Sequence, residues 1–208
     1  MQDRLTRQER KTQTRERLID AAAQVFARRG FEAASLDEVA AAAGYTKGAV
    51  YSNFASKTEL FVALIERRIE VESARHASGI DGASPEAAST YLAQESETES
   101  EWDRQWLILA IEFWLHAMRD ERARALLAEQ YERARTVSAE LIASFYRNSG
   151  QEPTLPARDM AIVIEALSIG LGFQSAIDPQ AVKMSLQGDV LVNLFHLPLP
   201  ARPQPSNG

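Results

Sequence analysis

The chain has 208 residues, of which 45% are hydrophobic and 25% are charged, the proportions of an ordinary soluble globular protein. It contains no cysteine, which excludes a disulfide framework, a cysteine-based zinc site and a cysteine nucleophile. The net charge of −6 is unevenly spread, because basic residues outnumber acidic ones up to residue 57 and acidic residues dominate afterwards, so the N-terminal part is the end suited to a polyanion.

The N-terminal segment, residues 1–13, is basic and has no apolar stretch. We therefore expect a disordered basic arm here rather than a signal peptide. The helix predicted next carries one apolar stripe, formed by Leu18, Ala22, Val25 and Phe26. Gly30 follows its last turn and is the expected C-cap.

Two short helices are predicted after this, separated by a tight turn. The segment "SLDEVAAAAG" begins with a capping box, in which Ser35 and Glu38 satisfy each other's backbone N–H groups, and it ends at Gly44. The segment "TKGAVYSNF" begins with Thr46 as the expected N-cap.

A longer amphipathic helix then opens on a second capping box, formed by Ser56 and Glu59. Beyond residue 75, "HASGIDGASPEAAS" is rich in Gly, Ser and Pro and predicts a loop or a domain boundary. The run "QESETESEWD" places acidic residues four apart, which disfavours a helix. We expect a solvated loop that leads into a helix capped by Ser100, and a cation site is the alternative.

Three or four long helices are predicted in the remainder, over about 102–119, 120–148 and 157–177, with a last one ending near His196. The tail, residues 198–208, is rich in Pro, and we expect it to be disordered. No segment shows the alternation typical of a strand, so the predicted fold class is all-α.

Two short helices across a glycine-containing turn are typical of a helix-turn-helix, whose second helix lies in the major groove of DNA. Val50 and Phe54 would face the core and leave the polar residues of this helix outward. Lys47 is then the strong donor suited to guanine, and the Ala49 methyl can contact a thymine methyl. The alternative is that these residues are only the solvated face of a surface helix.

Residues 14–66, above all "AAAQVFARRGFEAASLDEVAAAAG" and "TKGAVYSNFASKTEL", closely resemble the N-terminal domain of the TetR family of bacterial transcriptional regulators. The resemblance implies a three-helix helix-turn-helix domain over residues 14–57 and a larger helical ligand-binding and dimerisation domain over 58–197. It implies DNA base contacts from Lys47, Gly48, Ala49 and Ser52. It implies phosphate contacts from Ser35, Thr46, Tyr51, Asn53 and Lys57.

The segment "MAIVIEALSIGLGF" is apolar on all sides, and such a helix must be covered all round. Together with the last helix and the same two helices of a second subunit, it would form the four-helix interface of a homodimer, as the family implies. The interface residues would be Ala166, Ser168, Ile169, Gly170, Gly172, Phe173, Leu191 and Leu194. A buried helix in a monomer is the alternative. A two-fold dimer reads two half-sites roughly 34–36 Å apart, that is, a palindromic operator in double-stranded DNA.

Aromatic residues of the C-terminal part could line a pocket for an unknown small-molecule effector, because ligand pockets are mostly apolar. The candidates are Trp106, Phe113, Trp114, Tyr131 and Phe145. The alternative for each is an ordinary place in the core.

These patterns predict a TetR-type DNA-binding regulator, a repressor that a small-molecule ligand releases from its operator. The alternatives are a helical enzyme, for which Glu112 and His116 are the one local acid–histidine pair, and a purely structural helical dimer. We expect no cofactor and no metal site, because His76 and His196 are isolated in the sequence. The apolar run 106–118 is too short to span a bilayer, so we expect a cytoplasmic protein with no membrane contact.

Overall fold

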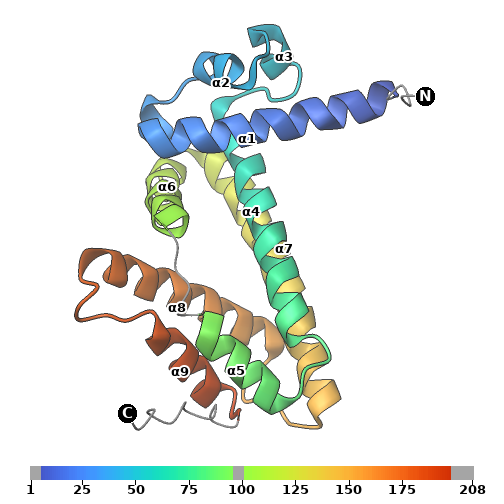
Figure 1. Cartoon of the computed structure of the whole chain (residues 1–208), viewed down its shortest axis with the longest axis vertical. Coiled ribbons are helices and arrows are strands. Elements are labelled where there is room, and N and C mark those ends of the chain that lie inside the picture. Colours follow the sequence, from blue (N-terminus) through green and yellow to red (C-terminus); the bar gives the residue numbers. More distant parts are fainter. Residues whose placement is uncertain (1–5, 96–100, 198–208) are drawn as a thin grey trace, which may run out of the picture. The chain divides into compact units, whose positions relative to one another are not determined.

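The computed structural model describes residues 6–95 and 101–197, and every regular element among them is a helix, as predicted (Figure 1). The chain divides into two compact units. The first comprises the described residues up to Glu70 together with Ile108–Gln130, and the second comprises Val71–Leu107 together with the residues from Tyr131 onward. The first unit is thus larger than the predicted domain 14–57, because it includes a distant segment that no local pattern reveals.

Helix α1 runs from Arg7 to Ala33 and begins with a capping box. The N–H of Glu9 donates to Thr6 Oγ1 at 3.2 Å, and the N–H of Thr6 donates to the Glu9 carboxylate at 2.6 Å. Hydrogen bonds from Thr6 to the Glu9 carboxylate lower the pKa of this carboxyl, with the bond from the Thr6 backbone as the main cause. Residues 7–13 are therefore helical where we expected a disordered arm, because the box satisfies the free N–H groups of the first turn. Residues 1–5 lie outside the described residues.

Gly30 interrupts α1 near its end, with φ 74° and ψ 169°. This backbone conformation is almost confined to glycine. Gly30 was the expected C-cap, but it kinks α1 instead, because residues 31–33 continue the helix and the C-cap is Ala34.

Helices α2 (Leu36–Ala43) and α3 (Lys47–Tyr51) follow, with α2 packed on α1 and α3 packed on α2 (Figure 1). The capping box of Ser35 and Glu38 is present as predicted and lowers the pKa of the Glu38 carboxyl. Helix α4 (Lys57–Ile80) opens on Ser56, whose Oγ accepts from the N–H of Glu59 at 3.1 Å.

The core of the first unit is built from aromatic rings in contact. Phe26 and Phe31 of α1, Phe61 of α4 and Phe113 of α6 are all fully buried. The ring centroids of Phe61 lie 5.0 Å from those of Phe26 and Phe31 and 4.6 Å from that of Phe113. Such edge-to-face and offset pairs stabilise a core beyond the area that they bury.

The remaining helices are α5 (Pro85–Glu95), α6 (Glu101–Ala117), α7 (Glu121–Ser149), α8 (Ala157–Ile177) and α9 (Ser185–Leu194). The second unit contains α5, α8 and α9, the end of α4 and α7 from Tyr131 onward. The part of α6 from Ile108 and the start of α7 belong to the first unit. The predicted loop beyond residue 75 was wrong over most of its length, because α4 continues to Ile80 and α5 begins at Pro85. Proline is well suited to a first helical position, since its missing N–H has no partner there anyway. Ser100, the expected cap, lies outside the described residues.

The core of this unit lies between α5, α7, α8 and α9, where α5 packs closely on α9. Arg135 of α7 holds α8 through Glu165, with Nε 2.8 Å from the carboxylate. Among the described helices, α8 is long and apolar enough by length and composition to cross a membrane, with a mean hydropathy of 1.7 over its most apolar window. Only 28% of that window is buried within the chain.

Candidate nucleic-acid interface and cavity

A tight turn joins α2 to α3 and fixes the direction of α3. Gly44 adopts the left-handed conformation, with φ 70° and ψ 28°, and the N–H of Tyr45 donates to the carbonyl of Ala40 at 2.9 Å. Thr46 then caps α3, because its Oγ1 accepts from the N–H of Ala49 at 3.2 Å. The predicted C-cap and N-cap are both confirmed.

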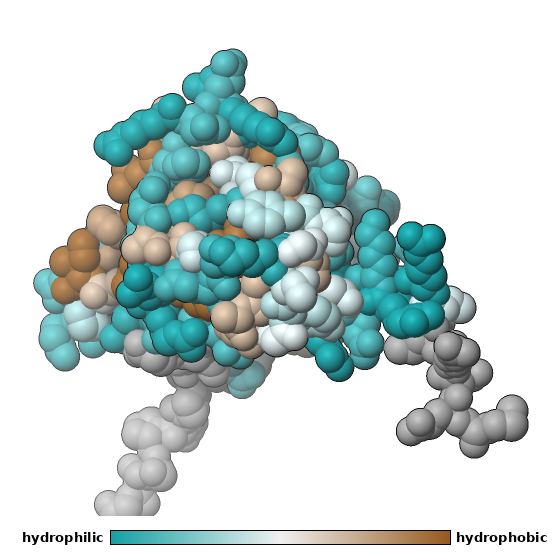
Figure 2. Space-filling view, turned by 90° about the horizontal axis from the view of Figure 1, so that it is seen from above, coloured by the Kyte–Doolittle hydropathy of each residue, from teal (hydrophilic) through white to brown (hydrophobic). Residues whose placement is uncertain are grey.

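One face of α3 anchors it, and the opposite face is open to solvent. Val50 is fully buried and Phe54 is 2% exposed, whereas Tyr51 is 57% exposed and both Lys47 and Ser52 are exposed. Figure 2 shows the molecule from above the view of Figure 1, and the surface that faces the viewer consists mainly of hydrophilic and intermediate residues. The spacing predicted this division for Val50, Phe54, Lys47, Tyr51 and Ser52, whereas Asn53, which it also placed outward, is half-buried.

Gly48 keeps the outer side of α3 free of a side chain. A Cβ at this position would meet only Thr46 Oγ1, at 3.8 Å, which is an ordinary contact. Internal packing therefore does not require glycine here, and the absence of a side chain leaves the backbone of α3 open on this side.

Lys47, at the start of α3, pairs with Asp37 of α2, and this hydrogen bond raises the pKa of the lysine. Both side chains are largely exposed to solvent. An exposed pair of this kind is weak, so a phosphate or a base edge can compete with Asp37 for the ammonium group.

Two of the residues predicted to contact phosphates hold helix ends within the first unit. Asn53 Nδ2 donates to the carbonyl of Ala49 at 2.8 Å, and its Oδ1 is buried. Lys57 Nζ donates to the carbonyls of Phe31 and Glu32 at 2.7 and 2.8 Å. The charge of Lys57 thus lies on the end of α1, where unpaired carbonyls attract a cation.

The first turns of α1 present further basic groups, because Arg7, Arg10 and Lys11 are all exposed. Arg15 connects this helix to the end of α3: its guanidinium lies 4.4 Å from the centroid of the Phe54 ring and donates to the carbonyl of Asn53 at 3.3 Å. The helix that carries these basic groups therefore contacts the chain at the C-terminal end of α3, at Asn53 and Phe54.

Glu112 and His116, the acid–histidine pair that an enzyme could use, both contact the end of α1 in the first unit. The Glu112 carboxylate accepts from the N–H of Phe31 at 2.7 Å, and a Cβ at Gly30 would lie 2.8 Å from its Oε2. The His116 ring packs at a tilt of 54° against the Phe31 ring, with 4.9 Å between centroids, and its Nδ1 is 3.3 Å from Glu32 Oε1. Both side chains hold the broken end of α1.

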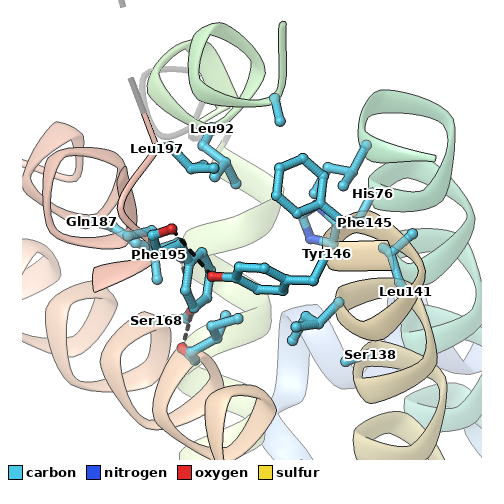
Figure 3. A pocket seen from close by; sticks show the side chains of 15 residues that line it. His76, Leu92, Ser138, Leu141, Phe145, Tyr146, Ser168, Gln187, Phe195 and Leu197 are labelled. Carbon is cyan, nitrogen blue, oxygen red and sulfur yellow. Dashed lines mark hydrogen bonds between the residues drawn. The ribbon is translucent and has the colours of Figure 1, made fainter. Parts of the chain in front are cut away.

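The second unit encloses a cavity of about 140 Å³ between α4, α5, α7, α8 and α9 (Figure 3). Three aromatic side chains line it, from Phe145, Tyr146 and Phe195, and most of the others are Ala, Leu and Ile. Of the five aromatic residues predicted for a pocket, Phe145 lines this cavity. Phe113 does not line the cavity. Its ring is buried against Phe61 in the core of the first unit. Trp106, Trp114 and Tyr131 are half-buried and do not line the cavity.

The cavity also has a polar end that the sequence analysis missed. Tyr146 donates its hydroxyl to the carbonyl of Phe195 at 3.2 Å, and burial raises the pKa of Tyr146. Gln187 Nε2 donates to Ser168 Oγ at 2.7 Å (Figure 3). These groups come from three helices and the residue after one of them, so their convergence leaves no local pattern in the sequence.

Apolar side chains remain exposed along one face of α8. They recur at helical spacing, as Val163, Ala166, Phe173 and Ile177, and the half-buried Gly170 lies at the same spacing between them. Phe173 is 46% exposed and Ile177 is 69% exposed, with Leu186 of α9 47% exposed. Three residues predicted for the dimer interface lie elsewhere: Gly172 is buried with Leu107 3.6 Å from where its Cβ would be, and Ser168 and Leu191 line the cavity.

Two family models match the chain. The model of the bacterial regulatory proteins of the tetR family covers residues 18–64, and the model of the BetI-type transcriptional repressor C-terminal domain covers residues 85–190. The second match alone spans half of the chain.

Individual proteins match one or both parts. The transcriptional activator FasR of Mycolicibacterium smegmatis is 43% identical over 68 residues, which is 33% of this chain and 29% of FasR, so the likeness covers less than a third of that relative. A protein named as a TetR-family transcriptional regulator from a Rhodococcus species has the same fold, with a TM-score of 0.73 and 20% identity over 88% of this chain and 99% of that one. A protein named as a transcriptional regulator from Saccharomonospora viridis, solved in complex with choline, has a TM-score of 0.66 and 18% identity over 89% and 96% of the two chains.

Proposed function

We propose that this chain, which belongs to the TetR family of bacterial transcriptional regulators, is a repressor that binds a palindromic operator as a homodimer and leaves it when a small molecule binds the second unit. The observation that carries the proposal is the capped helix α3, held by Val50 and Phe54 with an open polar face, within the segment that matches the family's DNA-binding domain. A regulator of this kind works in the cytoplasm, where its operator lies, and needs no catalytic step.

In this proposal the face of α3 enters the major groove. Lys47, Gly48, Ala49 and Ser52 meet base edges, with Lys47 exchanging Asp37 for guanine. The phosphates are held by groups around this face, namely Ser35 at the start of α2, Thr46, Tyr51 and the exposed basic residues of α1. We assign Asn53 and Lys57 a positioning role, since their donors hold the ends of α3 and α1.

The homodimer is proposed from the uncovered apolar face of α8. A helix of this hydropathy with 28% of its apolar window buried needs a further partner, and a second copy of the same face provides one. The interface then comprises Val163, Ala166, Gly170, Phe173 and Ile177, with Leu186 and Leu194 of α9 beside them. Sedimentation velocity tests this: the chain should sediment as a dimer, and Phe173→Glu should convert it to a monomer.

The effector step is proposed as a shift between two populations. A ligand that binds better to one conformer favours that conformer, and release follows if its two α3 helices no longer match adjacent grooves. The match to a BetI-type repressor C-terminal domain and the choline bound to a protein of the same fold support a small-molecule effector here.

Selection of bound duplexes from a random DNA pool tests the proposed function. We expect a two-fold sequence to be enriched, and we expect binding to weaken steeply as salt rises. Lys47→Ala should relax the preference at one base pair in each half-site, whereas Lys183→Ala, an exposed lysine of the second unit, should change nothing. If no sequence is enriched and no duplex binds at low salt, the chain is not a DNA-binding regulator, and a structural or enzymatic role takes its place.

A further inference from the structure

The cavity of the second unit has no formal charge on its wall from acidic, Lys or Arg side chains. Its lining consists of aliphatic and aromatic residues together with Ser138, Ser168, Gln187, Tyr146 and His76. A permanently charged ligand would lose its water there without an opposite charge in return, which is strongly unfavourable. An uncharged ligand avoids this penalty.

The volume of about 140 Å³ limits the ligand to a small molecule. A cavity of roughly 150 Å³ lined by Leu, Ile and Phe holds a benzene molecule. A single ring with one small substituent, or an aliphatic chain of similar bulk, therefore matches the space.

Hydrogen bonding at the polar end points to a ligand that donates. Three donors of the polar end are already used: Gln187 Nε2 donates to Ser168 Oγ, Ser168 Oγ donates to the carbonyl of Ile164 at 2.8 Å, and Tyr146 donates to the carbonyl of Phe195. Acceptors are left over, because no described residue donates to Gln187 Oε1 or to the Tyr146 hydroxyl oxygen. Figure 3 shows the Tyr146 hydroxyl directed toward the side where Gln187 and Phe195 lie. The hydroxyl of Ser138, on α7, can take either role.

We propose that this cavity binds a small, uncharged, mainly apolar molecule that carries one hydrogen-bond donor, such as a hydroxyl group, and that it rejects cations and anions of the same size. The inference rests on the proposed function for its biological meaning, because it identifies the chemical class of the effector. The apolar part occupies the space among Phe145, Leu141 and Leu92, and the donor meets Gln187 Oε1.

A matched series of four probes tests the chemistry on the full-length chain. The probes are benzyl alcohol, toluene, benzylammonium and benzoate, which share one ring and one substituent carbon. Calorimetric titration at pH 8, where an ordinary histidine is uncharged, should show binding of benzyl alcohol. Toluene should bind roughly three- to tenfold more weakly, since it makes no hydrogen bond, and both ions should bind at least about tenfold more weakly than benzyl alcohol.

Two variants locate the binding. Gln187→Leu keeps the size of the side chain and should bring the affinities for benzyl alcohol and toluene to within about twofold of each other. Ala88→Val, on the cavity wall, should reduce the binding of both. If Gln187→Leu does not fold, as judged by its melting curve, the ratio of benzyl alcohol to toluene in the unaltered chain still decides the point.

Three results would overturn the inference: no binding of any probe up to its solubility limit, toluene binding as tightly as benzyl alcohol, or an ion binding more tightly than either. DNA binding is measured on the same preparation. A chain that binds DNA and prefers benzylammonium refutes the ligand class alone, whereas a chain that prefers benzyl alcohol and binds no DNA refutes the proposed function alone.

Discussion

The two compact units are both helical and both use phenylalanine in their cores, yet one core is filled and the other is hollow. In the first unit, Phe61 contacts Phe26, Phe31 and Phe113 with ring centroids 4.6–5.0 Å apart. In the second unit, Phe145 lines a cavity of about 140 Å³. A filled core holds a short helix such as α3 in one position, whereas an open space in a core lowers stability and makes room for a ligand. In the proposed function, the unit with the filled core binds DNA and the unit with the cavity binds the effector.

Truncating the central ring of the filled core should have the largest effect. Phe61→Ala removes a fully buried side chain and should lower the free energy of unfolding of the first unit by about 3–5 kcal/mol. Denaturant unfolding followed by circular dichroism measures this change. Met118→Ala, at a side chain of the same unit that is 75% exposed, is the control and should change it by less than about 0.5 kcal/mol. A small loss for Phe61→Ala would mean that the core of the first unit is not tightly packed.

Gly30 and Gly44 of the first unit both have positive φ, but only Gly30 has close neighbours. Gly30→Ala should lower the stability by up to about 3 kcal/mol, because its φ of 74° and ψ of 169° suit glycine alone and the new Cβ would lie 2.8 Å from the Glu112 carboxylate. Gly44→Ala should lower it by about 1 kcal/mol, since a Cβ there would have no neighbour within 4 Å. Thermal unfolding of the two variants gives the order, and equal losses would show that Glu112 does not press on Gly30.

One added pair of methyl groups in each core should have opposite effects. Ala22→Val, at a fully buried position of α1, should lower the stability by about 1–3 kcal/mol through overpacking. Ala88→Val adds the same atoms beside the cavity and should raise the stability by about 0.5–2 kcal/mol. Chemical denaturation of both variants decides the matter, and a loss at Ala88 as large as that at Ala22 would contradict a hollow second core.

Lys57 tests whether a basic residue near α3 supports the first unit or binds DNA. Lys57→Ala removes two hydrogen bonds at the end of α1 and a cation 4.7 Å from the centroid of the Phe31 ring, so the stability should fall by roughly 1 kcal/mol. The salt dependence of DNA binding should stay the same. A slope reduced by about one unit would instead show that Lys57 neutralises a phosphate.

The sequence predicted the first unit well wherever the determinants are local. The capping box at Ser35, the turn at Gly44 and the burial of Val50 and Phe54 each depend on residues within about four positions, and all are present in the structure. Thr6 and Glu9 have the same capping-box spacing, which is the local signal for the helical start of α1.

The sequence predicted little of the cavity, because its wall is assembled from distant segments. His76, Tyr146 and Gln187 lie on different helices, and no spacing rule connects them. Aromatic content alone suggested Phe113 and Phe145 equally, yet the first fills one core and the second lines an open space in the other. Which core a side chain enters is set by helix packing, and a single sequence does not contain that information in a local form.

The spacing of the two half-sites tests the central claim most directly. A duplex selected by the chain is compared, by fluorescence anisotropy at fixed salt, with the same duplex carrying five extra base pairs at its centre. Five base pairs are about half a helical turn, so the insertion moves one half-site to the opposite side of the DNA. If a homodimer reads both half-sites with its two α3 helices, the affinity should fall at least about tenfold. An unchanged affinity would contradict the account.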